Sequence, residues 1–242
     1  MTTAAALIIG DEILSGKVCD TNTPLLIELL RDIGVQLCRV VYLCDSVEEI
    51  AAEVKACSEG FDAVITSGGV GPTHDDRTVE AVARAFGVGV VRHPDVEAMI
   101  RAYWGERFTE AALRMADMPD GARLLYTSDG LLPLVVFHNI YLLPGVPRLF
   151  AAKLGALRAE LKGEPLELRH LYLNSDESSI APLLSQVDQE FPAVKIGSYP
   201  RFEAGDFRVW VTVEAAASSD VDSALRRLLD LVPADQVVRV ED

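Results

Sequence analysis

Basic residues are few in this sequence. The chain of 242 residues carries 22 Lys and Arg against 37 Asp and Glu, for a net charge of −15. A surface with this balance repels phosphate backbones, so the charge excludes proteins that wrap a nucleic-acid duplex. No apolar run approaches the roughly 20 residues that cross a bilayer, and the start at Met1 lacks the basic segment of a secretory signal. We therefore expect no nucleic-acid partner, no membrane partner and a cytoplasmic location.

Cysteine is also scarce, and several familiar catalytic signatures are missing. The four cysteines form no CxxC pair, which argues against a zinc site and a disulfide framework and predicts reduced, mostly buried thiols. No Gly-Lys-Ser/Thr follows a glycine loop, so there is no Walker A motif, and the loop does not match GxGxxG, which disfavours a nicotinamide dehydrogenase. No Ser/His/Asp or Cys/His set is recognisable, so a covalent nucleophile is not expected.

What the sequence does contain is an alternation of apolar runs and helical patterns. This alternation predicts parallel strands joined by helical crossovers, and hence an α/β fold. Strands are expected at 4–9, 35–43, 62–66 and 122–126, and a further segment of apolar, β-branched character covers 134–143. Helices are expected at 24–33, 46–59, 79–86, 94–103, 109–116 and 147–161.

A domain boundary is predicted at Lys162-Gly-Glu-Pro165, because glycine and proline together interrupt the pattern there. The chain is thereby divided into residues 1–165 and residues 166–242. In the second part the order is a strand at 167–173, a helix at 178–190, strands at 194–198 and 207–214, a helix at 220–231 and a short last strand. This order predicts a smaller α+β domain, and both parts are acidic.

The strongest motif is the loop after the third strand, Thr66-Ser-Gly-Gly-Val-Gly-Pro-Thr-His-Asp-Asp-Arg-Thr78. Ligands of open parallel sheets bind at the carboxyl ends of strands, where this loop lies. Its glycines let backbone amides approach an anion closely, and the next helix adds the partial positive charge of its N-terminus. The alternative is a tight structural turn. The residues predicted to hold phosphate are Ser67, Gly68, Gly69, Gly71 and Thr73.

Two carboxylates, Asp75 and Asp76, stand at the start of the helix that follows this loop. Simple helix capping is one explanation. The other is a divalent cation, because two carboxylates beside a phosphate repel it unless a cation lies between them. Oxygen ligands of this kind suit Mg²⁺ or Mn²⁺. His74, the one histidine within a motif, is a candidate contact to phosphate or metal.

Further motifs follow the other strands. The segment Gly10-Asp-Glu-Ile-Leu-Ser-Gly16 comes after the first strand, and its Asp11 is a candidate metal ligand, with a solvated turn as the equal alternative. Asp45 closes the second strand at the same predicted edge, where it either faces the ligand or precedes a helix cap. The turn Leu143-Pro-Gly-Val-Pro147 is rigid and leaves backbone groups, at Gly145, free for a flat ring.

Taken together, GDEILSG at 10–16, TSGGVGPTHDDRT at 66–78 and LPGVP at 143–147 resemble the MoCF family, the molybdopterin-binding domain of molybdenum-cofactor proteins. The stretches Asp20-Thr-Asn-Thr23 and Gly197-Ser-Tyr-Pro200 resemble one branch in particular. That branch comprises the N-terminal part of the competence/damage-inducible protein CinA and the MoCF-like half of eukaryotic FAD synthase. The similarity covers nearly all of the chain.

This resemblance implies a three-layer α/β/α domain whose ligand lies above the SGGxGPT loop, followed by a KH-like α+β domain, and it adds Asn22 to the candidate ligand residues. In the molybdenum branch, the matching aspartates serve molybdopterin adenylylation, which carries onto Asp76 and Asp45. In the CinA and FAD-synthase branch, the pocket is associated with metal-dependent cleavage of a dinucleotide pyrophosphate, ADP-ribose or FAD. Self-association into a homo-oligomer is expected from the same resemblance.

We therefore expect the chain to bind a nucleotide or pterin diphosphate and to hydrolyse its pyrophosphate with Mg²⁺, Mn²⁺ or Co²⁺. Asp11, Asp75 and Asp76 are the predicted metal ligands, and Asp45, Asp75 and Asp76 the predicted catalytic residues. The alternatives are a non-catalytic molybdopterin-binding or flavin-binding protein and an adenylyl transferase acting on molybdopterin. The second domain is not expected to bind RNA, because it contains no GxxG clamp and is acidic.

Overall fold

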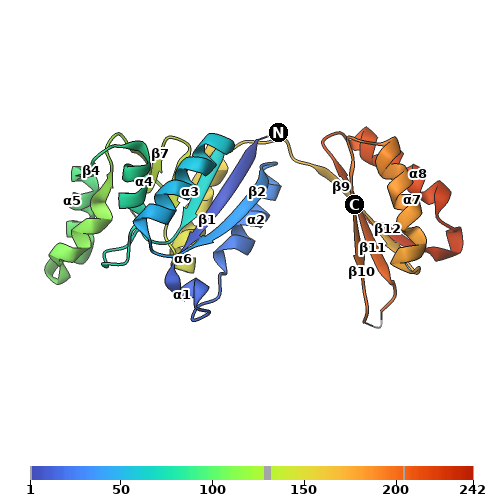
Figure 1. Ribbon diagram of the computed structural model, residues 1–242, viewed down its shortest axis with the longest axis horizontal. Helices are drawn as coiled ribbons and strands as arrows, with labels where there is room; N and C mark the ends of the chain where they lie inside the picture. Colours follow the sequence, from blue (N-terminus) through green and yellow to red (C-terminus); the bar gives the residue numbers. More distant parts are fainter. Residues whose placement is uncertain (1, 128–131, 204, 242) are drawn as a thin grey trace. The chain divides into compact units, whose positions relative to one another are not determined.

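The computed structural model describes residues 2–127, 132–203 and 205–241. The chain divides into two compact units, Met1–Glu164 and Pro165–Asp242, each with its own sheet and core (Figure 1). Among the described helices, none combines the length and the apolar character needed to cross a bilayer.

The first unit is built on one six-stranded sheet in the order β2-β1-β3-β8-β7-β6. Neighbouring strands are parallel from β2 to β8, and the last two pairings, β8 with β7 and β7 with β6, are antiparallel. The mostly parallel α/β sheet predicted from the sequence is thus confirmed. The strands are β1 (Thr3–Ile9), β2 (Gln36–Leu43), β3 (Ala63–Ser67), β6 (Arg123–Leu125), β7 (Leu134–Phe137) and β8 (Ile140–Leu143).

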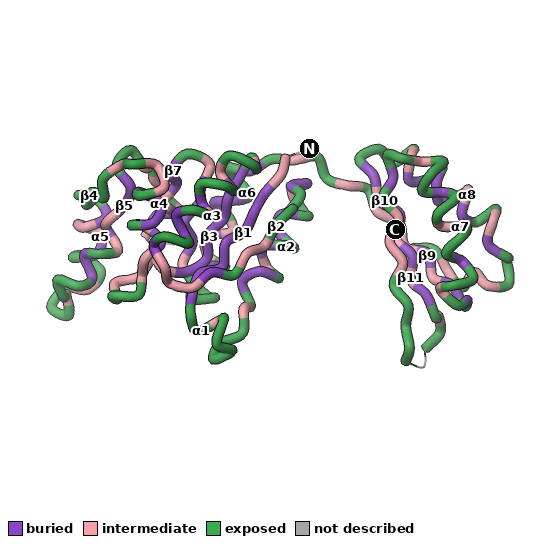
Figure 2. The backbone as a smooth tube through the Cα atoms, in the orientation of Figure 1, coloured by how far each residue is buried: buried purple, intermediate pink, exposed green. Residues whose placement is uncertain are grey.

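Helices cover both faces of this sheet, which makes three layers. The long helices are α2 (Asn22–Asp32), α3 (Val47–Gly60), α4 (Thr78–Phe86) and α6 (Pro147–Glu160). Residues 4, 6 and 8 of β1 pack with α2 and α6 in one core, whereas residues 5, 7 and 9 pack with α3 and α4 in the other. Because successive side chains of a strand point to opposite faces, a strand between two helical layers is apolar throughout, and β1 is buried along its length (Figure 2).

The first unit also contains two further helices, a second small sheet and two 3₁₀ segments. A short helix α1 (Asp11–Leu14) follows β1, and a two-stranded antiparallel sheet pairs β4 (Val90–Arg92) with β5 (Asp117–Pro119). Between these two strands lie α5 (Pro94–Trp104) and two 3₁₀ segments, η1 (Gly105–Arg107) and η2 (Glu110–Ala116). Together with the underside of the sheet, α5 and η2 enclose a small separate core.

The structure differs from the sequence-based expectation at several places. Of the four cysteines, which were expected to be mostly buried, only Cys57 is buried. The apolar segment 134–143 is two strands, β7 and β8, joined by a turn at His138 and Asn139 in which His138 has a φ of 52°. The polar pair His138-Asn139, which interrupts the apolar run, was the sequence signal for this reversal. The helix expected at 109–116 is the 3₁₀ segment η2, and the small β4–β5 sheet was not predicted because each strand has only three residues and β4 is exposed.

The second unit is a four-stranded antiparallel sheet in the order β10-β11-β9-β12. Its elements are β9 (Glu167–Leu173), α7 (Glu177–Glu190), β10 (Lys195–Pro200), β11 (Val209–Ala215), α8 (Ser218–Leu231), the 3₁₀ segment η3 (Ala234–Gln236) and β12 (Val237–Glu241). The alternate residues of β11 that are buried, such as Val211 and Val213, share a core with α7 and α8. The smaller α+β fold predicted for this part of the chain is confirmed.

Hydrogen bonds to the Asp20 carboxylate hold the start of helix α2, and they predict a pH-dependent contribution of Asp20 to stability. The Asp20 carboxylate accepts hydrogen bonds from the amides of Asn22 and Thr23, at 2.9 and 3.0 Å, and from the Tyr42 hydroxyl at 2.9 Å. Burial raises the pKa of Asp20, but the hydrogen bonds from Thr23, Tyr42 and Asn22 outweigh it and leave the pKa below its ordinary value.

We expect Asp20→Ala to lower the free energy of unfolding by about 1 kcal/mol at pH 7, as the loss of a helix cap does. An aspartate with a lowered folded pKa stabilises the protein above its unfolded pKa, near 4, and the difference from the parent is lost as the pH falls through the folded value. Urea unfolding at pH 7 and at acidic pH measures this difference in the free energy of unfolding. The exposed Asp120→Ala serves as control, and equal stability of parent and Asp20→Ala at pH 7 contradicts the capping role.

Candidate functional site

The register of the parallel strands gathers the predicted motifs at one edge of the sheet. Ile9 at the end of β1 lies beside Leu43 at the end of β2, and Ser67 at the end of β3 pairs with Leu143 at the end of β8. The loops that leave these four neighbouring strands carry the predicted site residues. Residues from four distant parts of the sequence therefore meet at the carboxyl ends of the strands, where ligands of such sheets bind.

Asn22, in the first turn of α2, ties two of these loops together. Its side-chain amide nitrogen donates to the Ser67 hydroxyl oxygen at 2.9 Å and to the Gly145 carbonyl oxygen at 2.8 Å. The residue is only 5% exposed, and its Oδ1 is buried with no hydrogen-bond partner among the described residues. A buried polar atom without a partner costs free energy, and this Oδ1 remains available beside the loop as a hydrogen-bond acceptor for a ligand.

The first two glycines of the loop are required by its close packing. Gly68 has a φ of 106°, and a Cβ there would lie 2.2 Å from the Ile9 carbonyl oxygen. Gly69 has a φ of 68°, and its Cβ would lie 2.2 Å from the hydroxyl oxygen of Thr78. Both values of φ belong to the left-handed region that side chains rarely adopt. The loop therefore lies against β1 and α4 in a form that only glycine allows.

The same loop presents backbone donors that the protein does not use. The amides of Gly69, Val70 and Gly71 donate to no acceptor in the described part of the chain. Helix α4 follows directly, and it begins at Arg77 without a hydrogen bond from a capping side chain. Successive free amides and a helix N-terminus form a concentration of partial positive charge that suits an anionic oxygen.

Asp76 is engaged within the loop. Its Oδ2 accepts hydrogen bonds from the amide and the hydroxyl of Thr73, at 2.8 and 2.6 Å. A Cβ on Gly71 would lie 2.7 Å from this same oxygen, so the third glycine makes room for the carboxylate. The Asp76 carbonyl oxygen accepts from Arg114 of η2 at 3.2 Å. In this arrangement Asp76 closes the turn that shapes the loop.

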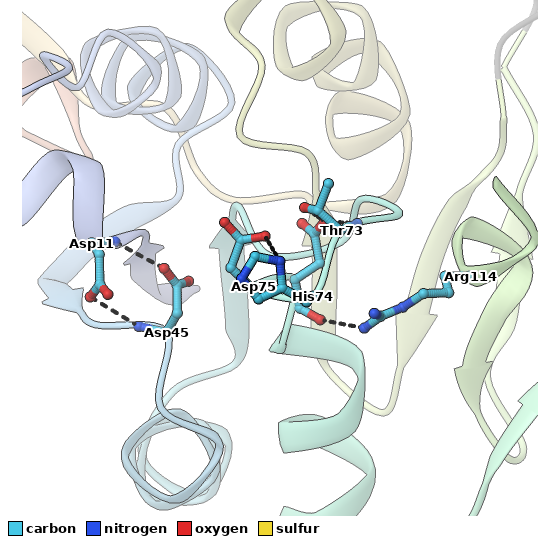
Figure 3. A network of polar contacts seen from close by, with 7 residues as sticks. Asp11, Asp45, Thr73, His74, Asp75 and Arg114 are labelled. Atoms are coloured by element: carbon cyan, nitrogen blue, oxygen red, sulfur yellow. Dashed lines mark hydrogen bonds and ion pairs between the residues drawn. The ribbon is translucent and has the colours of Figure 1, made fainter. Parts of the chain in front are cut away.

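Asp11 and Asp45 lock the ends of β1 and β2 together, as Figure 3 shows. The Asp11 amide donates to the Asp45 carboxylate at 3.0 Å, and the Asp45 amide donates to the Asp11 carboxylate at 3.4 Å. Burial raises the pKa of Asp45; the Asp11 amide opposes this, and the negative charges of Asp11, Glu12 and Asp75 raise the pKa further. Burial and the neighbouring carboxylates thus disfavour the ionisation of Asp45.

Asp75 lies on the exposed side of the loop beside His74, whose Nδ1 is 3.8 Å from the Asp75 carboxylate (Figure 3). The Thr73 hydroxyl, the Asp75 amide itself and the positive charges of His74 and Arg114 lower the pKa of Asp75. Asp75 is therefore ionised over the whole neutral range, and it adds a permanent negative charge between the Asp11–Asp45 pair and the glycine loop.

The predicted residues fall into three groups. Asn22, Ser67 and Gly145 form one hydrogen-bonded cluster, and Thr73 with Asp76 and Gly71 form a second. Asp11 and Asp45 form the third, and the negative charge of Asp75, within the loop, raises the pKa of Asp45. In the described ranges, no three or more His, Cys, Asp and Glu side chains are gathered closely enough to hold a metal ion by themselves.

Two contacts in this region were not anticipated. Thr78 is fully buried, and its hydroxyl donates to the Gly68 carbonyl oxygen at 2.8 Å, which anchors the loop to the start of α4. Thr78 is the last residue of the loop motif, and its spacing from Gly68 could have indicated this contact. Arg114 comes from a segment 38 positions after Asp76, and nothing in the sequence pattern indicated that contact.

Comparisons with known proteins show what the two units of the chain are similar to. The family model described as a probable molybdopterin binding domain matches residues 5–162, and the model described as the FAD synthase middle domain matches residues 165–241. The probable FAD synthase of Caenorhabditis elegans is 31% identical over 260 residues, covering 95% of this chain and 50% of that protein. The CinA-like protein of Myxococcus xanthus is 31% identical over 236 residues, covering 90% of this chain and 56% of that protein.

Among solved structures, the crystal structure of the protein CinA from Thermoplasma acidophilum is similar to the chain. Its TM-score is 0.60 at 32% identity, and the match covers 66% of this chain and 97% of that one. The present chain spans about half the length of the FAD synthases that it matches. The likeness therefore bears on the family and on the fold.

Proposed function

Because the chain belongs to the family described as the probable molybdopterin binding domain, we propose that it binds a dinucleotide diphosphate at the glycine loop and hydrolyses the pyrophosphate with a divalent cation. One observation carries the proposal: unused backbone amides at Gly69, Val70 and Gly71 lie next to a group of carboxylates that includes Asp11 and Asp45. Amides suit phosphate oxygens, whereas the carboxylates suit a cation that bridges to the same phosphate.

The donor set fits a divalent cation that keeps most of its coordination for water and substrate. Mg²⁺ is usually held by one or two protein carboxylates together with phosphate oxygens, so a closed cluster of protein ligands is not needed. Asp11 and Asp75 are the carboxylates that would hold the cation. Asp76 was a predicted ligand, but its Oδ2 is bound to Thr73, and we assign it the role of holding the loop. When bound, the cation neutralises charge on the phosphate and activates water.

FAD and ADP-ribose are the proposed substrates. The second unit matches the FAD synthase middle domain, and a relative over nearly the whole chain is named a probable FAD synthase. In the reaction, the oxygen of water bonds to one phosphorus, the bond from that phosphorus to the bridging oxygen breaks, and the bridging oxygen leaves on the other phosphate. FAD gives FMN and AMP, and ADP-ribose gives ribose 5-phosphate and AMP.

Within this proposal each group of residues has a separate task. The glycine loop and the N-terminus of α4 hold phosphate oxygens. Asn22 fixes the loop relative to Gly145, and its Oδ1 accepts a hydrogen bond from the ligand. Asp45 has a raised pKa, so it is suited to receive the proton that the attacking water loses. Self-association of the chain remains a further part of the proposal.

The test is turnover followed by mass spectrometry. Purified protein with Mg²⁺, Mn²⁺ or Co²⁺ is expected to convert FAD or ADP-ribose into monophosphates, and excess EDTA is expected to stop the reaction. Asp45→Asn should lower the rate by at least about tenfold, while the exposed Asp120→Asn should leave it unchanged. Metal-independent binding without turnover, unaffected by Asp45→Asn, would instead identify a carrier of flavin or molybdopterin.

Asp45→Asn also carries an expectation for stability that separates a functional role from a structural one. An acid with a raised folded pKa destabilises the fold when ionised, above that pKa, and this cost disappears below the unfolded pKa. The variant should therefore be at least as stable as the parent at pH 7, with the difference shrinking as the pH falls toward about 4. Thermal unfolding at both pH values shows whether lost turnover comes from lost stability.

A further inference from the structure

The second unit contains a hollow of its own, about 260 Å³ in volume, where α7 begins beside the ends of β10 and β11. All of its lining residues lie between 175 and 209, within the second unit. The site proposed above uses none of them. Side chains of two arginines, Arg201 and Arg208, form part of the lining.

The two arginines are held next to each other by the β10–β11 hairpin. The Arg201 amide donates to the Arg208 carbonyl oxygen at 2.7 Å, and the Arg208 amide donates to the Leu173 carbonyl oxygen at 2.8 Å. The Arg201 guanidinium lies 5.3 Å from the ring centroid of Phe207, and the Arg208 guanidinium pairs with Asp176. Two guanidinium groups are thereby placed on one wall of the hollow.

The start of helix α7 also lines the hollow and offers hydrogen-bond donors. Helix α7 has 14 residues, and its N-cap residue, Asp176, makes no side-chain capping bond. Ser175, the residue before this N-cap, lines the hollow and is only 6% exposed. Its hydroxyl is a further donor for a bound ligand.

The acidic side chains of the hollow do not cancel this character. Glu177 accepts a hydrogen bond from the Ser198 hydroxyl at 2.7 Å, which holds its carboxylate toward β10. Asp176 pairs with Arg208, so it occupies the position that an anionic ligand would take. Arg201 forms no ion pair with any described carboxylate and is left to contact an anion.

We propose that this hollow binds the phosphate group of a small molecule. Two guanidinium groups, the N-terminus of a long helix without a side-chain cap and the Ser175 hydroxyl are all donors, and a phosphate provides acceptor oxygens for each of them. Phosphate binding displaces Asp176 from Arg208. Phe202, which also lines the hollow and is 95% exposed, offers a ring face for a base attached to that phosphate.

Amide chemical shifts of the ¹⁵N-labelled full chain test this proposal, with inorganic phosphate and AMP as probes at constant ionic strength. Phosphate should shift the amides of Ser178 and Ser179 at the start of α7. Arg208→Gln and Arg201→Gln should each weaken this response by about tenfold, the usual effect of losing one charge-assisted hydrogen bond. Asp176→Asn should strengthen it, because the competing carboxylate is removed.

The matched control is Arg226→Gln, which removes an exposed arginine of α8 and the same charge from the same unit. It should bind phosphate as the parent does. Tighter binding of AMP than of phosphate, with shifts at Phe202, supports contact with the base. No shift at Ser178 and Ser179, or equal weakening in all three arginine variants, overturns the proposal. Shifts at Gly69 to Gly71 report the first unit and are unaffected by Arg208→Gln.

Discussion

Gly68→Ala is expected to abolish ligand binding and to lower the free energy of unfolding by about 3 kcal/mol or more. The left-handed φ of Gly68 costs a residue with a side chain about 1–3 kcal/mol. In addition, the new Cβ would lie 2.2 Å from the Ile9 carbonyl oxygen, a backbone atom at the buried end of β1 that cannot move without disturbing the sheet. Forcing atoms into such a packed region typically costs another 1–3 kcal/mol or so.

Gly87→Ala separates these two causes. Gly87 ends α4 with a φ of 67°, but a Cβ there has no neighbour within 4 Å. This variant should lose only about 1–2 kcal/mol, the cost of the left-handed conformation alone, and should bind ligand normally. Urea unfolding and titration with FAD or ADP-ribose measure both effects. If Gly68→Ala is no less stable than Gly87→Ala and still binds, then the close packing of the loop against β1 is not what shapes the site.

Asp76→Ala is expected to lower kcat/KM by about a hundredfold, through the loop rather than through a lost metal ligand. Removing the carboxylate leaves the amide and hydroxyl of Thr73 without their acceptor and releases the turn beside the free amides. Misplacing a binding group by about 1 Å costs a rate on this order. Asp76→Asn keeps an acceptor oxygen at the same place, so it should retain activity within about tenfold of the parent.

The two roles of Asp76 predict different patterns across a short series of variants. If Asp76 holds the loop, then Thr73→Val should resemble Asp76→Ala, whereas Thr73→Ser, which keeps both donors, should resemble the parent. If Asp76 instead binds the cation, then Asp76→Asn should be as inactive as Asp76→Ala, and higher metal concentrations should partly restore both. Steady-state kinetics over a range of Mn²⁺ concentrations distinguishes these patterns.

The parts of the fold that follow from local pattern were predictable. The six residues 4–9 are apolar without a break, and that composition is required of a strand whose two faces contact different helical layers. Ser46 was the expected start of a helix, and its hydroxyl oxygen accepts from the Glu49 amide at 3.4 Å. The left-handed glycines of the loop were likewise suggested by composition alone, since few other residues tolerate that conformation.

What could not be predicted depends on contacts between distant residues. The reversal at His138 and Asn139 had only a two-residue signal in the sequence, this polar pair, and the buried strands on either side of it read as one continuous run. The sequence places four aspartates near strand ends but does not show which groups each of them contacts. Only the structure shows that Asp76 is bound to Thr73 while Asp11 and Asp45 bind each other's backbone.

The pairing of β3 with β8 also determines when the site comes into being during folding. Ser67 and Leu143 are partners in the sheet although they are 76 positions apart, and the Asn22 side chain bridges to Gly145 over 123 positions. Contacts of such sequence separation form slowly, because a long loop must close before they stabilise anything. A growing chain cannot build the site before residue 145 has been synthesised. Ligand therefore binds the finished fold, draws the folding equilibrium toward it by mass action, and should slow the turnover of the protein by proteases.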